Sequence, residues 1–81
     1  MIGTVRLIHR SKVGVQTQNG DYSLFEETGD DFALGDQVAW NNDTASGRES
    51  VANQTRGGWV DVLFLNHHVS AENISSLVSG R

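Results

Sequence analysis

The chain has 81 residues, a net charge of −4, and neither cysteine nor proline. This length allows one small domain, and the lack of cysteine excludes a disulfide scaffold and zinc sites built on cysteine. The longest apolar run, residues 62–65, is far shorter than the roughly 20 residues of a transmembrane helix, and no signal peptide is visible. We therefore expect a single cytoplasmic domain, residues 1–81, with no membrane partner.

The charge is concentrated in segments of opposite sign. Residues 1–20 carry three bases, Arg6, Arg10 and Lys12, and no acid, whereas residues 21–43 carry seven acids and no base. The acids have a simple explanation, since charged surfaces keep small domains soluble. The same distribution leaves room for a small basic face, so the overall acidity argues only against strong non-specific binding to nucleic acid.

The residue pattern favours strands in the first third of the chain. Valine is the commonest apolar residue, with nine copies, and β-branched side chains suit a pleated sheet. Apolar and polar residues alternate in two segments, 3–9 and 13–18, which we expect to be strands. Asn19-Gly20 follows and predicts a type I′ turn, with positive φ at both residues, leading into a third strand at 21–26.

The middle of the chain is less regular. Residues 27–35 are acidic, and we expect Phe32 and Leu34 to fill the core from this segment. Trp40 alternates with Val38 and is also expected in the core. Clusters of turn residues, including a loop at 42–47, separate three further strands, which we expect at 37–41, 48–55 and 59–65.

The last residues change to helical spacing. Ile74 and Val78 recur on one helix face, and Ser70 is a good N-cap, so the pattern predicts a helix over 71–79 that stops near Gly80. We expect this helix to pack over an open end of the sheet or against the exposed face of the last strand.

Five or six short strands in a chain of this size predict an all-β fold, a small OB-like barrel with a short C-terminal helix. An SH3-like barrel is the alternative. Three strands that meander, an irregular crossover of about ten residues, and further strands that close the sheet fit the OB order well.

Residues 2–55 resemble the cold-shock domain, a minimal OB fold that binds single-stranded RNA and DNA. The resemblance rests on four segments: Gly3-Thr4-Val5-Arg6, similar to the family's G-x-V-K; Lys12-Val13-Gly14-Val15, at its first aromatic motif; Asp21-Tyr22-Ser23-Leu24-Phe25, at its second; and Leu34-Gly35-Asp36-Gln37-Val38, similar to E-G-x-x-V. It implies a barrel core at 2–55, with residues 56–81 forming an added strand and helix.

The aromatic motifs of that family are largely missing here. Exposed rings of the family stack on bases, and each stacked base contributes about 1–3 kcal/mol. Val13, Val15 and Ser23 stand where the family has rings, and Phe25 is the one exposed ring that we expect to remain.

The leading hypothesis is therefore a non-catalytic protein that binds single-stranded RNA or DNA weakly or in a specialised way. Bases on the first two strands and in the fifth-strand region would contact phosphates. The predicted nucleic-acid-binding residues are Arg6, His9, Arg10, Lys12, Phe25, Arg48 and Arg56.

A second hypothesis starts from the strand at 59–65, which is largely apolar on both faces. A strand of this kind must be covered on both sides, and a second protein or another copy of the chain could provide one cover. The predicted protein-interaction residues are Trp59, Leu63 and Leu65.

Neither catalysis nor a cofactor is expected. His67 and His68 are adjacent and should point to opposite faces of a strand, which serves a single metal ion poorly. Asp30-Asp31 lacks the spacing of a calcium loop, and no serine lies in a nucleophile elbow.

Overall fold

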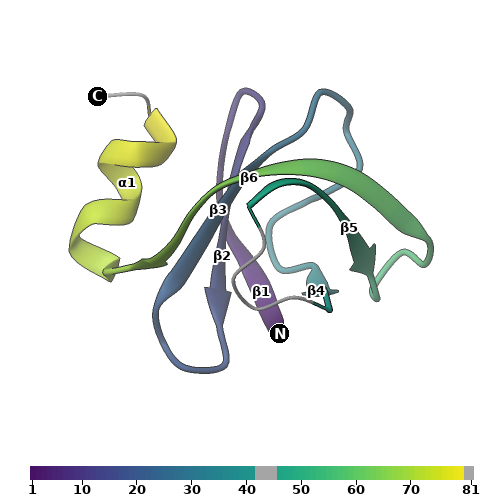
Figure 1. Cartoon of the computed structure of the whole chain (residues 1–81), viewed down its shortest axis with the longest axis horizontal. Coiled ribbons are helices and arrows are strands. Elements are labelled where there is room, and N and C mark those ends of the chain that lie inside the picture. Colours follow the sequence, from purple (N-terminus) through teal and green to yellow (C-terminus); the bar gives the residue numbers. More distant parts are fainter. Residues whose placement is uncertain (42–45, 80–81) are drawn as a thin grey trace.

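The computed structural model describes residues 1–41 and 46–79. Most of the predicted loop at 42–47, namely residues 42–45, and the predicted helix stop at Gly80 lie outside the described residues. Figure 1 shows curved strands that wrap around one another, with one helix at their side. The elements are β1 (Ile2–His9), β2 (Lys12–Thr17), β3 (Tyr22–Glu26), β4 (Gln37–Ala39), β5 (Gly47–Asn53), β6 (Trp59–Val69) and α1 (Ala71–Ser79). The fold is a mostly β barrel with a short C-terminal helix, as predicted.

The strands form a closed antiparallel barrel in the order β1-β2-β3-β6-β5-β4. β6 pairs with β3 on one side and with β5 on the other, and β4 pairs with β1. β6 is therefore the strand that closes the barrel. The expectation of a barrel core that ends at residue 55 was wrong, because β3 and β5 have no direct pairing that would close the sheet without β6.

The β2–β3 turn differs from the predicted type. Gly20 has a φ of 91°, whereas Asn19 is not among the residues with positive φ. The Thr17 amide donates to the Asp21 carbonyl and the Gly20 amide donates to the Thr17 carbonyl. The loop therefore spans three residues and uses one left-handed glycine, which is the next most common hairpin connection after the two-residue type I′ turn.

Aromatic rings fill the barrel interior. Phe25 packs edge-on against Phe32 and Phe64, with ring centroids 5.0 and 5.4 Å apart, and Trp40 lies 5.1 Å from Phe64. Valines from β1, β2, β4, β5 and β6 complete this cluster. Phe32 thus fills the core from the irregular segment as predicted, but Leu34 is 65% exposed, contrary to expectation.

A buried polar network holds the irregular segment against the β5–β6 turn. Asn53 is 1% exposed, and its amide nitrogen donates to the Asp36 carboxylate at 2.8 Å and to the Asp31 carbonyl at 2.9 Å. Its amide oxygen accepts from the Arg56 backbone at 3.1 Å. Because buried backbone groups of a loop need hydrogen-bond partners, this side chain helps to fix the path of residues 27–36.

Helix α1 packs on the outer surface of β1, β2 and β3. Ile74 and Val78 are buried there against Leu24, with Leu7 packed alongside. Neither predicted position, an open end of the barrel or the face of β6, was correct. Figure 1 shows α1 on the opposite side of the molecule from the β5–β6 turn.

Candidate functional site

The outer face of β1–β3, where the cold-shock resemblance places nucleic acid, is covered by α1. Gly14 in the middle of β2 makes this possible, because a Cβ at that position would lie 3.3 Å from side-chain atoms of Ile74, Leu7 and Val78. A register shift in β1 between Val5 and Leu7 turns Val5 into the barrel and Leu7 toward the helix. This face therefore serves as a second small core.

Phe25 is not an exposed ring. Its side chain is completely buried in the barrel interior, between Phe32 and Phe64. The expectation of an exposed ring at this position was wrong, because Phe25 alternates with Leu24 and only one of two adjacent strand residues can face outward. Here the outward residue is Leu24, and α1 covers it.

Three predicted bases gather at the β1–β2 turn. His9 pairs with Lys12 across the turn, and Arg10 between them has a φ of 57°. The Lys12 ammonium lies 3.5 Å from the Leu77 carbonyl of α1, whose own last turn contains no base. Since the carbonyl end of a helix favours a nearby cation, Lys12 also has a role in holding the helix.

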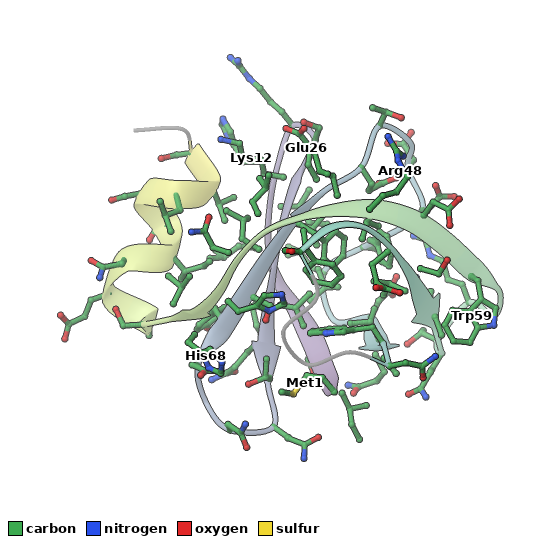
Figure 2. The ribbon with its side chains drawn as sticks, in the orientation of Figure 1. Met1, Lys12, Glu26, Arg48, Trp59 and His68 are labelled. Atoms are coloured by element: carbon green, nitrogen blue, oxygen red, sulfur yellow. The ribbon has the colours of Figure 1, made fainter. Side chains whose placement is uncertain are left out.

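Arg48 lies in the same row of the sheet but is separated from this turn. The strand register pairs Lys12 with Glu26, Glu26 with Leu63, and Leu63 with Arg48. Figure 2 shows Lys12, Glu26 and Arg48 along the same upper side of the barrel. Three strand spacings of about 4.8 Å place the two bases roughly 14 Å apart, with a carboxylate between them.

Arg6 and Arg56 do not join this row. The Arg6 Nε donates to the Gln16 side chain at 3.3 Å, beside an open groove of ≈ 280 Å³. The Arg56 guanidinium lies 3.4 Å from the Asp36 carboxylate and donates to the Asp30 carbonyl at 2.9 Å. Arg56 is thus part of the network around Asn53, and the predicted bases form no single continuous patch.

The three predicted protein-interaction residues share the outer face of β6. Trp59, Leu63 and Leu65 are 62%, 37% and 41% exposed, whereas the alternate residues Val62 and Phe64 are buried. Trp59 stands at the end of β6 next to the β5–β6 turn, on the far right of Figure 2. We call these three residues the β6 stripe.

Asp61 interrupts the β6 stripe, and a shallow hollow of ≈ 130 Å³ opens beside Leu63. The acidic residues Glu26, Glu27 and Asp61 line this hollow together with one base, Arg48. The alternation of residues 59–65 placed Asp61 on this face already in the sequence. Glu26 was missed as a surface neighbour of Leu63, because only the β3–β6 register brings them together.

The two adjacent histidines make separate contacts. His67 Nδ1 lies 2.8 Å from the Ser23 hydroxyl, and the His67 ring stacks on Phe64. His68 Nδ1 lies 2.9 Å from the Asp21 carboxylate. Within residues 1–41 and 46–79, no group of three or more potential metal-ligating side chains comes together.

Two carboxyl groups have shifted pKa values of opposite sign. The Thr17 hydroxyl, followed by His68, holds the pKa of Asp21 below its ordinary value. Burial raises the pKa of Glu27, and the hydrogen bond that it accepts from the Gly29 amide at 2.9 Å only partly offsets this effect. The Asp21 shift thus reflects contacts with β2 and β6, whereas the Glu27 shift reflects burial.

Comparisons with known protein families, with curated proteins and with solved structures found no match. The resemblance to the cold-shock domain therefore rests on the residues quoted above. In the described part of the chain, no helix has the length and apolar character needed to cross a bilayer.

Proposed function

We propose that this chain is a non-catalytic module that binds another polypeptide through the β6 stripe. The carrying observation is an exposed tryptophan aligned with two exposed leucines on the outer face of one strand. Tryptophan is enriched among the residues that dominate binding energy at protein interfaces. Within the stripe, Trp59 pairs with β5, and Leu63 pairs with both β3 and β5. We expect a partner to pack on the outer face of the strand, where the three side chains are exposed.

The exposed apolar area of the β6 stripe is large enough for a small protein–protein contact. Aromatic side chains bury about 150–250 Å² each, so Trp59 at 62% exposure offers on the order of 150 Å². With the two leucines, the stripe reaches the few hundred Å² at which exposed apolar patches often mark interaction sites.

Selection from a random peptide display library tests this proposal. Peptides selected on the wild-type chain should lose at least tenfold in affinity for the Trp59→Ala variant. Leu34→Ala is the matched control, since Leu34 is equally exposed but lies outside the stripe. The proposal would be contradicted by peptides that bind the wild-type chain, Trp59→Ala and Leu34→Ala equally, or by a selection that yields no binders.

Nucleic-acid binding by an OB-like barrel is the second candidate. One observation favours it: Arg10 and Arg48 form no ion pair within the described residues, and Lys12 shares the sheet row of Arg48. The β1–β3 meander and the crossover at 27–36 also support the OB relation. Three phosphate contacts would give weak, salt-sensitive binding.

A titration of labelled single-stranded oligonucleotides at low and moderate salt tests this candidate. Binding at low salt that weakens in the Lys12→Ala and Arg48→Ala variants, but not in Arg56→Ala, is expected if the row contacts phosphates. The absence of binding even at low salt would contradict it.

A further inference from the structure

We propose that the partner of the β6 stripe is a polypeptide segment that carries lysine or arginine beside its apolar residues. This inference rests on the proposed function and specifies the chemistry of the partner. It starts from the hollow next to Leu63, which is lined by three acidic residues, Glu26, Glu27 and Asp61, and by one base, Arg48.

Among the described residues, the carboxylates of Glu26 and Asp61 accept hydrogen bonds only from neutral groups. Glu26 accepts from the Ser11 hydroxyl at 3.3 Å, and Asp61 accepts from the Ser50 hydroxyl at 2.8 Å. Neither forms an ion pair within the described residues. A carboxylate with free lone pairs beside an apolar surface is well suited to a charge-assisted hydrogen bond from a partner cation.

The surroundings extend the same preference. The chain as a whole carries a net charge of −4, which favours a cationic partner at long range. The exposed Trp59 ring can also accept a cation over its face, an interaction of about 0.5–1 kcal/mol at exposed sites. Apolar contacts along the stripe, carboxylates in the hollow and an open aromatic face therefore all fit a basic, apolar segment.

A second copy of the chain fits this surface less well. Two copies would each bring a net charge of −4, and the stripe offers a few hundred Å², against about 800 Å² per partner in a stable interface of standard size. A nucleic-acid strand also fits the β6 stripe less well, because its phosphates would lie next to the carboxylates of Glu26 and Asp61 and be repelled by them.

The experiment uses three dye-labelled synthetic peptides with the same apolar residues, flanked by lysine, by glutamate or by serine. Fluorescence polarisation at low salt should show the lysine-flanked peptide binding at least tenfold more tightly than the glutamate-flanked one. Asp61→Asn should reduce that preference at least threefold, because it removes a negative charge beside the stripe. The asparagine amide oxygen can still accept the Ser50 hydrogen bond, so the local structure is kept. Added salt should also reduce the preference for the lysine-flanked peptide.

Asp30→Asn is the matched control, because it removes the same charge from an exposed position outside the hollow. An equal effect of Asp30→Asn and Asp61→Asn would overturn the proposal by attributing the preference to net charge alone. Equal binding of all three peptides, with loss in Trp59→Ala, would overturn the partner chemistry while leaving the proposed function standing. Binding that is insensitive to Trp59→Ala would overturn both. Sedimentation that shows a dimer lost in Trp59→Ala would assign the stripe to a second copy.

Discussion

Replacing Asn53 by alanine removes the centre of the buried network that anchors the irregular segment. The amide loses one hydrogen bond to the Asp36 carboxylate, one to the Asp31 carbonyl and one from the Arg56 backbone. A hydrogen bond to a charged group contributes about 1.5–3 kcal/mol and a neutral one about 0.5–1.5 kcal/mol. The site is 1% exposed, so water cannot replace these partners without rearrangement. We expect a loss of roughly 3–4 kcal/mol in the free energy of unfolding.

Urea unfolding followed by tryptophan emission measures this loss. Trp40 is 2% exposed and reports unfolding, whereas Trp59 is already largely exposed and changes little. With a slope of about 1–3 kcal/mol per molar urea, the midpoint should fall by roughly 1–4 M.

Gln54→Ala is the matched control. Gln54 is the next residue and is exposed, and only its backbone is involved, donating to the Gln37 carbonyl at 2.8 Å. Its free energy of unfolding should change by no more than about 0.5 kcal/mol. If Asn53→Ala costs less than about 1 kcal/mol, the network does not hold the segment in the way that its hydrogen bonds indicate.

Four further substitutions test other parts of the molecule. Gly3→Ala places a Cβ 2.6 Å from the Gln16 carbonyl oxygen, so urea unfolding should show a loss of about 1–3 kcal/mol or more, and a neutral result would show that β1 and β2 are less closely apposed. Ile74→Ala should cost about 2–5 kcal/mol and raise amide exchange across α1; unchanged exchange would mean that Ile74 does not secure the helix. Glu27 has a raised pKa, so its favourable contribution is present at low pH and is lost as pH rises through that pKa. Glu27→Gln should remove this dependence, and a wild-type minus variant difference that is flat with pH would contradict it. The lowered pKa of Asp21 predicts the opposite slope: its contribution is present at neutral pH and lost in acid, so a difference from Asp21→Asn that persists unchanged into strong acid would refute it.

Local patterns in the sequence predicted most of the elements. The 3.6-residue spacing predicted α1 over 71–79, and the structure has the same bounds. Alternation predicted the strands and the burial of Trp40. Alternation also placed Trp59 and Leu63 on one face of β6, because residue direction along a strand depends on sequence position alone.

Relations between strands could not be predicted in the same way. Phe25 and Leu24 are both large and apolar, so alternation alone does not say which one faces the interior. The choice depends on the register of β3 with β2 and β6, which is set by distant residues. Similarly, nothing in the sequence indicates that Arg56 is paired, because its partner Asp36 lies 20 positions earlier and only the fold brings the two together.

The position of α1 explains why Trp59 and Leu63 of the β6 stripe are open. Only Ser70 separates the end of β6 from the first residue of α1, so the helix must pack near Val69. Val69 pairs with Tyr22 of β3, and the chain turns there onto the outer face of β3, β2 and β1. The distance along β6 from Val69 back to Trp59 is ten residues, or about 33 Å of extended strand, whereas a nine-residue helix spans only about 14 Å. The same short connection that closes the face expected to bind nucleic acid therefore leaves the outer face of the first half of β6 beyond the reach of the helix, and this is the face on which we propose that a partner packs.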